Sequence, residues 1–167
     1  YRISFQSLWR DEVDAILFAT RDWPALLTMF TRPGENGPLY FILLRPWLSL
    51  LGTSEFAARF SSLTFGVLAV PLTSLLGRKL LSDSVSVWGA LLVACSPYLI
   101  WYSQESKMYA LLVCLSVASV WLLLNALRGN RLGYWVAYII FTSLSFYTHI
   151  LAVALLPVHI LLFIVGG

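Results

Sequence analysis

The stretch P-L-Y-F-I-L-L-R-P-W-L-S-L-L (Pro38–Leu51) decides how the chain folds, because it is apolar but short. As a helix its 14 residues would reach about 21 Å, against about 30 Å for the hydrocarbon core of a bilayer. Arg45 and Pro46 add a charge and an expected helix break near its centre. We therefore predict a segment that lies at a membrane interface, with Tyr40 and Trp47 at the depth of the headgroups.

The composition of the chain is that of a membrane protein. Hydrophobic residues make up 59% and charged residues 11%, and the mean hydropathy is +0.81. Because every backbone amide in hydrocarbon must be paired within its own segment, the long apolar runs are expected to be helices. The predicted fold is an all-α, polytopic transmembrane helix bundle with about five spans, at Phe56–Leu76, Val85–Tyr102, Tyr109–Leu127, Leu132–Thr148 and Leu151–Val165.

The chain divides into two predicted parts. Residues 1–55 are expected to form a loop with amphipathic interfacial helices, and residues 56–167 the membrane helices, the last of them cut short. Pro71, Pro97 and Pro157 predict kinks or helix ends, and Asp83 or Ser84 is the expected N-cap of the second span. We expect the sequence to be a piece of a larger protein and to be inactive alone.

The short segment also fixes which loops share a side of the membrane. If Pro38–Leu51 does not cross, the region 11–35 emerges on the same face as Arg59, the loop with Glu105 and Lys107, and His149. If it does cross, the acids near residue 11 are separated from the rest. The first topology gathers nearly all the reactive side chains on one face, so we favour it.

The charges leave the orientation open. The positive-inside rule favours a cytoplasmic location for Arg78, Lys79, Arg128 and Arg131, and the other face would then be extracytoplasmic. That face carries more Arg and Lys than the cytoplasmic one, which opposes the assignment, although five acids accompany its first four arginines. The net charge of +3 comes from scattered residues without a basic run, which argues against a nucleic-acid partner.

Five motifs, in order and spacing, resemble the GT-C superfamily of membrane glycosyltransferases, in the branch of protein O-mannosyltransferases and lipid A aminoarabinose transferases. They are S-L-W-R-D-E (7–12), G-P-L-Y-F-I-L-L (37–44), L-G-T-S-E-F-A-A-R-F-S-S (51–62), S-P-Y-L-I-W-Y-S-Q-E-S-K-M-Y-A-L-L (96–112) and Y-T-H (147–149). The likeness covers almost the whole chain and corresponds to the N-terminal part of the family's membrane module. It implies transfer of a sugar, with inversion, from a polyprenyl phosphate to a protein, lipid or glycan acceptor.

The resemblance implies a base in the first loop. The first acid of the family's Asp-Glu pair corresponds to Asp11, which would take the acceptor's proton, with Glu12 as its catalytic neighbour. Read from the residues alone, Asp11 could instead N-cap an amphipathic helix running from Glu12 to Thr20.

Cations and polar groups are expected to bind the donor. Arg59 could hold the lipid phosphate with its planar guanidinium, or it could pair with Glu55 four residues earlier. Arg10 and Arg45 are weaker candidates for the phosphate. The remaining predicted substrate-binding residues are Gln104, Glu105, Lys107 and Tyr109.

A divalent metal is the one cofactor that the resemblance suggests, with Glu105 and His149 as its predicted ligands. Tyr109 stands where many relatives carry an Asp, so metal dependence is not secured by the motif. His159, Cys95 and Cys114 are expected only to pack.

The predicted location is the bacterial plasma membrane rather than the endoplasmic reticulum, with the active face extracytoplasmic and membrane lipids as neighbours. Two other classes stay open, a lipid or solute transporter and a non-catalytic scaffold subunit. A transporter should carry ionisable groups at mid-membrane, where the apolar runs offer only His159.

Overall fold

The computed structural model describes residues 7–32, 37–129 and 131–166. Over these ranges the chain is helical and contains no strand, so the predicted all-α fold is confirmed. The helices are α1 (Arg10–Ala19), α2 (Trp23–Thr28), α3 (Pro38–Leu51), α4 (Glu55–Leu80), α5 (Asp83–Ala94), α6 (Pro97–Ser103), α7 (Tyr109–Gly129), α8 (Leu132–Thr148), the 3-10 turn η1 (Ile150–Ala154) and α9 (Leu155–Gly166).

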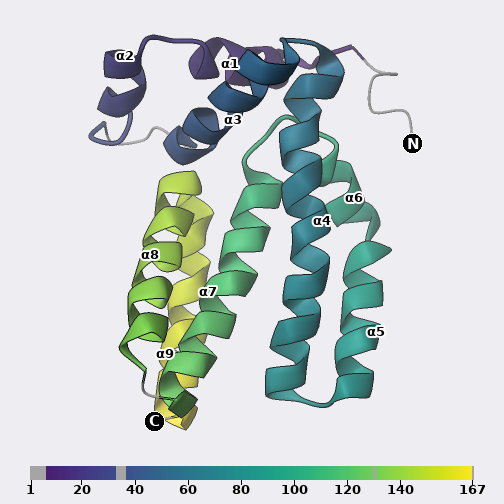
Figure 1. The fold of residues 1–167 in the computed structure, drawn as a ribbon, viewed down its shortest axis with the longest axis vertical. Helices are drawn as coiled ribbons and strands as arrows, with labels where there is room; N and C mark the ends of the chain where they lie inside the picture. The colour runs from purple at the N-terminus through teal and green to yellow at the C-terminus, as the bar shows by residue number, and fades with distance from the viewer. Residues whose placement is uncertain (1–6, 33–36, 130, 167) are drawn as a thin grey trace.

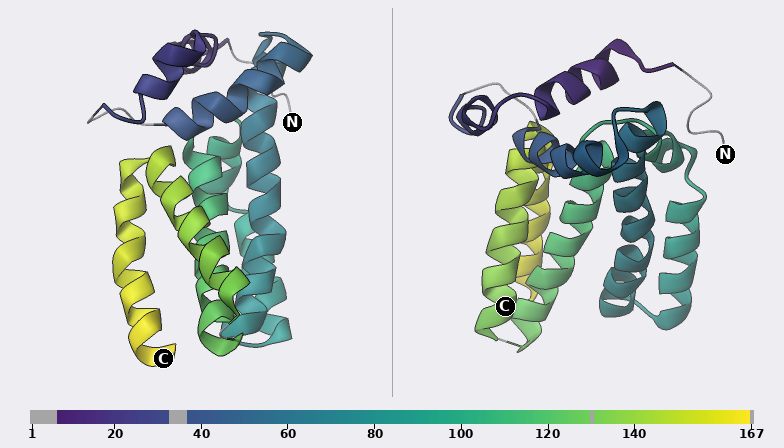
Figure 2. Two further views of the ribbon diagram at one scale, coloured as in Figure 1. Left: turned by 60° about the vertical axis from the view of Figure 1, so that its left-hand side comes forward. Right: turned by 45° about the horizontal axis from the view of Figure 1, so that its top comes forward.

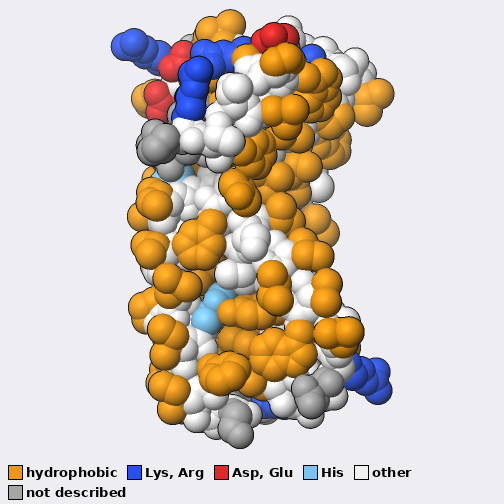
Figure 3. Space-filling view, turned by 90° about the vertical axis from the view of Figure 1, so that its left-hand side faces the viewer, with side chains coloured by type: hydrophobic (Ala, Val, Ile, Leu, Met, Phe, Trp, Pro, Cys, Tyr) orange, Lys and Arg blue, Asp and Glu red, His pale blue; other side chains and the backbone are white. Residues whose placement is uncertain are grey.

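The later helices form a bundle whose long axes run roughly alongside one another (Figure 1). Within the described residues, α4 and α7 are each long and apolar enough to cross a membrane, and the bent pair α5 and α6 could form a third span. The segments predicted as the fourth and fifth spans form α8 and the η1–α9 segment, which pack against α7 but are shorter than the two candidate spans, so about five spans stays a prediction. Charged side chains gather toward the ends of the face seen in Figure 3, and hydrophobic side chains cover the length between them.

Helices α1, α2 and α3 form a cap across one end of this bundle (Figures 1 and 2). The decisive segment, α3, lies across the ends of the other helices instead of alongside them, as expected of a helix that does not cross. The expected break at Pro46 is wrong, because α3 continues through it. Pro46 removes only one helical hydrogen bond, and the buried Leu44 and Leu48 on either side hold the helix against the bundle.

The second predicted span is broken instead. Helix α5 gives way to α6 at Ser96 and Pro97, and the two helix axes differ by 57°. Pro71, by contrast, lies inside α4. The expected N-cap of α5 is also wrong, because the Oγ of Ser82 accepts the hydrogen bond from the backbone N–H of Val85. Ser82 has the extended backbone of an N-cap, so the helix begins one residue earlier than the sequence suggested.

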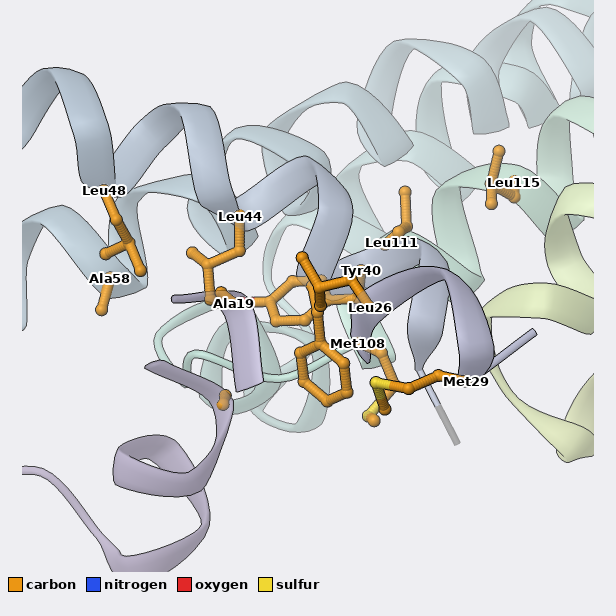
Figure 4. Packing of buried hydrophobic residues seen from close by; sticks show 12 residues of the cluster. Ala19, Leu26, Met29, Tyr40, Leu44, Leu48, Ala58, Met108, Leu111 and Leu115 are labelled. Carbon is orange, nitrogen blue, oxygen red and sulfur yellow. The ribbon is translucent and has the colours of Figure 1, made fainter. Parts of the chain in front are cut away.

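A buried hydrophobic cluster joins the cap to the bundle (Figure 4). Tyr40, the only member with a hydroxyl, is fully buried and does not lie among solvent or headgroups, contrary to the prediction. The cluster therefore fixes the position of the cap and of the loop before α7. Its buried members are Ala15, Ala19, Leu26, Met29, Tyr40, Phe41, Leu44, Leu48, Ala58, Met108, Leu111 and Leu115.

Truncating this cluster should destabilise the protein. Leu44 is completely buried, so Leu44→Ala should lower the free energy of unfolding by about 2–5 kcal/mol, measured by denaturant unfolding in detergent micelles. Leu50 lies on the same helix with 81% of its surface exposed and provides the matched control, Leu50→Ala. Equal losses in the two variants would contradict the packing described here.

Candidate functional site

Asp11 and Glu12 lie in the first turn of α1, where Glu12 is buried and Asp11 is exposed. The helix begins after Trp9, whose backbone N–H donates to Glu12 Oε2 at 3.1 Å. This return bond from the third helical residue fixes the first turn. Asp11 is therefore not the N-cap, and that alternative is wrong. With the turn fixed in this way, Glu12 faces the bundle and Asp11 faces outward.

Glu12 is buried in an ion pair with Arg59. Arg59 donates from Nε to Glu12 Oε1 at 2.8 Å and from Nη2 to Oε2 at 2.7 Å, a two-pronged contact between side chains that are 5% and 2% exposed. The backbone N–H of Ser106 donates to the same Oε1 at 2.8 Å. One carboxylate thus joins α1, α4 and the loop between α6 and α7.

These contacts set the protonation of Glu12. Burial by itself raises the pKa of this carboxyl, but the hydrogen bonds from Arg59, Ser106 and Trp9 together with the charge of Arg59 outweigh it, and the pKa lies below its ordinary value of 4.5. Glu12 is therefore an anion at neutral pH. Its carboxylate is enclosed by Arg59 and by backbone N–H groups, and the catalytic role expected of Glu12 stays a prediction.

A cluster of hydroxyls holds the same loop from the other side. The Tyr40 hydroxyl lies 2.8 Å from Ser62 Oγ and 3.3 Å from both Ser61 Oγ and Ser106 Oγ. Ser62 Oγ in turn donates to the carbonyl oxygen of Lys107 at 3.1 Å. Burial raises the pKa of Tyr40, so the phenol stays neutral. The loop that carries Glu105 and Lys107 is consequently fixed to both α3 and α4.

A polar cavity of about 340 Å³ opens where α1 meets this loop. Asp11, with its side chain 72% exposed, lies at this cavity, and its Oδ2 is 3.4 Å from Lys107 Nζ. Glu105 accepts a hydrogen bond from Trp101 Nε1 at 2.7 Å. Of the predicted site residues, the cavity brings together Arg10, Asp11, Glu12, Glu105, Lys107 and Tyr109.

The other predicted residues lie around this cavity. Gln104 lines a neighbouring apolar groove, and His149 packs its ring against Tyr109 with centroids 5.7 Å apart. Arg59 donates to Glu12 and not to Glu55, so the predicted pairing with Glu55 is wrong, whereas its contact with the lipid phosphate stays a prediction. Arg45 donates to the backbone carbonyls of Ala19 and Arg21 near the end of α1, which gives it a structural role.

The hydroxyl cluster and the partner of Arg59 were missed by the sequence analysis. Tyr40 and Ser106 are 66 residues apart, and Glu12 and Arg59 are 47 residues apart, so no local spacing relates them. The adjacent Ser61 and Ser62 in an apolar helix indicated buried polar contacts. The sequence did not indicate which residues they contact.

Glu105 and His149 were predicted to bind a metal ion, and among the described residues no other acidic, His or Cys side chain joins them in a metal-binding group. Across residues 7–32, 37–129 and 131–166, no group of three or more His, Cys, Asp and Glu side chains is arranged to hold a metal ion. His149 Nδ1 accepts the backbone N–H of Leu151, and burial with the nearby charge of Lys107 lowers its pKa. The pair therefore stays a prediction, and the chemistry proposed below uses no metal.

Together these features define a polytopic α-helical membrane protein with a polar, acid-containing site at one end of an apolar bundle. The family model described as dolichyl-phosphate-mannose-protein mannosyltransferase matches residues 33–167. The chain belongs to this family, which confirms the predicted resemblance to membrane glycosyltransferases of the GT-C type. No curated protein and no solved structure matches the chain at a significant level.

Membership points to a membrane-embedded glycosyltransferase that uses a polyprenyl-phosphate sugar donor. The matched range includes Arg59, the loop with Glu105 and Lys107, and His149, but not α1. The family match therefore does not cover Asp11, whose role as the base stays a prediction, and the structure shows only that Asp11 lies at the polar cavity.

Removing the phenolic hydroxyl should loosen the site loop. Tyr40→Phe deletes the shared partner of Ser61, Ser62 and Ser106, and should cost about 1–3 kcal/mol in unfolding free energy and speed amide exchange in residues 104–108. Tyr147→Phe, at a ring that is 46% exposed, is the control. Unchanged exchange in the loop of the Tyr40 variant would contradict the role given to the cluster.

Low pH should weaken the attachment of α1 to the bundle, because protonation of Glu12 removes its charge from the ion pair with Arg59. A carboxyl whose pKa is lowered by folding stabilises the folded state above its unfolded value of about 4.5, and this contribution is lost as the pH falls through the folded-state pKa. Unfolding measured between about pH 6 and about pH 3 should therefore show a larger loss of stability in the unaltered protein than in Glu12→Gln. The same pH dependence in both proteins would show that Glu12 does not titrate as described.

Proposed function

We propose that the protein transfers a sugar from a polyprenyl phosphate to an acceptor hydroxyl or amine, with inversion, and that Asp11 is the base. The observation that carries the proposal is the pairing of an exposed carboxylate, Asp11, with an ammonium, Lys107, at one polar cavity on the capped end of an apolar bundle. The family match supports the class of donor.

The proposed reaction is a single displacement at the anomeric carbon. The acceptor oxygen or nitrogen forms the new bond to that carbon, and the bond from the carbon to the phosphate oxygen breaks, with its electron pair leaving on the phosphate. The acceptor's proton passes to the Asp11 carboxylate. Inverting transfer of this kind needs a base on the face opposite the leaving group.

Lys107 serves the leaving group in this proposal. An ammonium stabilises the charge that develops on the departing phosphate, and phosphate oxygens are strong acceptors from such donors. The phosphate competes with Asp11 for Lys107, so donor binding frees the Asp11 carboxylate to accept a proton. Glu105, Gln104 and Tyr109 are the neighbouring groups proposed to contact the donor.

The role proposed for the Glu12–Arg59 pair is positioning. It holds α1 over the loop and thereby sets the separation of Asp11 from Lys107. The direct contact of Arg59 with the lipid phosphate stays a prediction. The active face is proposed to be extracytoplasmic and the membrane the bacterial plasma membrane. The acceptor, whether protein, lipid or glycan, is left open by this site.

A transporter remains the alternative class. Transporters carry ionisable groups within the helix bundle, near the middle of the membrane. His159 is such a group, buried between Tyr138, whose hydroxyl is 3.1 Å from Nδ1, and Ser119, whose Oγ is 3.4 Å from Nε2. Both contacts join neighbouring helices. That arrangement supports helix packing, and the exposed carboxylate and the ammonium at the polar cavity favour the transferase.

The base can be tested with the protein in its full natural length, reconstituted in nanodiscs. With a radiolabelled polyprenyl-phosphate sugar, Asp11→Asn should lower the rate of transfer by about 100-fold or more, since general-base catalysis contributes about 10²–10⁴ in rate. Donor binding and the melting temperature should be retained, because the Asp11 side chain is exposed. Asp14→Asn, on the same helix, should transfer normally. Normal transfer by Asp11→Asn would remove Asp11 from the active site.

A further inference from the structure

The end of the bundle away from the cap carries a second group of charged side chains. After Arg59, every charged residue outside the loop with Glu105 and Lys107 belongs to this end. Figure 1 shows the last turns of α4 and α7 there, at the far end of the bundle from the cap. The four cations of this end, called the basic patch below, are Arg78, Lys79, Arg128 and Arg131.

The basic patch joins two distant parts of the chain. Arg78 and Lys79 lie in the last turn of α4, Arg128 lies in the last turn of α7, and Arg131 directly precedes α8. Arg128 Nη2 donates to the backbone carbonyl oxygen of Lys79 at 2.7 Å. This contact holds the end of α4 beside the end of α7, and it gathers the cations of both helices.

The turn from α4 into α5 is tightly packed. A Cβ at Gly77 would lie 2.9 Å from Ser86 Cβ, so the last turn of α4 and the first turns of α5 approach more closely than a larger residue would allow. Ser86 Oγ donates to the carbonyl oxygen of Asp83 at 2.7 Å. The positions of Arg78 and Lys79 are therefore set by the fold.

The partners of the basic patch within the chain leave it positively charged. Asp83 is the one acid of this part of the sequence, and its Oδ1 is 3.5 Å from Arg78 Nε. Both side chains are largely exposed, so this ion pair is weak and is screened by salt. The negative C-terminal ends of α4 and α7 favour nearby cations but carry only partial charges. An anion from outside the chain therefore meets a net positive surface.

Exposed apolar side chains flank the cations. Leu80 and Leu81 follow the two cations of α4, and Leu132 follows Arg131. Because α4 and α7 are long and apolar enough to cross a membrane, their ends reach the level where headgroups meet acyl chains. Leucine side chains beside guanidinium groups match a molecule that is anionic at its head and apolar below it.

We propose that the basic patch binds the headgroup of an anionic phospholipid in the leaflet opposite the polar cavity, with the acyl chains against Leu81 and Leu132. A phosphate diester suits the planar forks of Arg128 and Arg131. The inference stands on charge and position at the far end of the bundle and does not use the proposed transfer reaction. The bound lipid fixes the depth of the bundle in the membrane.

The test uses phosphatidylglycerol with a photoreactive group beside its phosphate, in phosphatidylcholine nanodiscs that contain the full-length protein. The label should attach at the ends of α4 and α7 or the starts of α5 and α8, about fivefold or more above a phosphatidylcholine probe of the same design. Unlabelled phosphatidylglycerol should compete with the label. Inorganic phosphate at millimolar concentration should not, because it lacks the acyl chains.

The combined variant Lys79→Gln and Arg131→Gln removes one cation from each side of the patch and keeps the backbone carbonyl that Arg128 contacts. It should lower the labelling about fivefold or more at an unchanged melting temperature. Lys79→Arg with Arg131→Lys keeps the charges and should retain the labelling. Arg21→Gln is the matched control, because Arg21 is an exposed cation on the cap.

Three results would overturn the proposal. The first is equal labelling by the phosphatidylcholine probe, or labelling spread over the whole apolar surface. The second is competition by inorganic phosphate, which would show a site for the free ion. The third is undiminished labelling of a folded Lys79→Gln and Arg131→Gln variant. Sugar transfer is measured separately, so the basic patch and the proposed active site are tested independently.

Discussion

The site depends on one buried carboxylate. Removing Glu12 and Arg59 from water carries a desolvation cost of several kcal/mol per ion, which is offset only when the geometry is good and the remaining lone pairs are used. Here both oxygens of Glu12 accept from Arg59, and backbone N–H groups of Trp9 and Ser106 complete the set. Because these partners come from three separate segments, the pair determines how α1, α4 and the loop before α7 meet.

The position of Asp11 follows from that constraint. Adjacent residues on a helix point about 100° apart, so fixing Glu12 inward turns Asp11 outward, toward Lys107. The Tyr40 hydroxyl cluster anchors the opposite side of the same loop to α3. A short helix lying across the bundle thus places an exposed acid beside a cation.

The sequence could predict the architecture more fully than the contacts within it. Hydropathy and the length of Pro38–Leu51 were enough for a helical bundle with a cap, and span parity was enough to gather Asp11, Glu105 and Lys107 at one end. Glu55 was the predicted ion-pair partner of Arg59, because spacing rules see only neighbours three or four residues away. Its partner is 47 residues distant. Tertiary packing likewise explains why α3 continues through Pro46. Helix propensity describes only the local sequence and could not predict this.

A double-mutant cycle on Glu12 and Arg59 tests the central claim most directly. Glu12→Gln and Arg59→Met should each lower the unfolding free energy by about 3–5 kcal/mol, because each removes one member of a buried ion pair. The double variant should lose at least about 2 kcal/mol less than the sum of the single losses. Losses that add to within about 0.5 kcal/mol would show that the two side chains act independently, and would contradict the account given for the whole site.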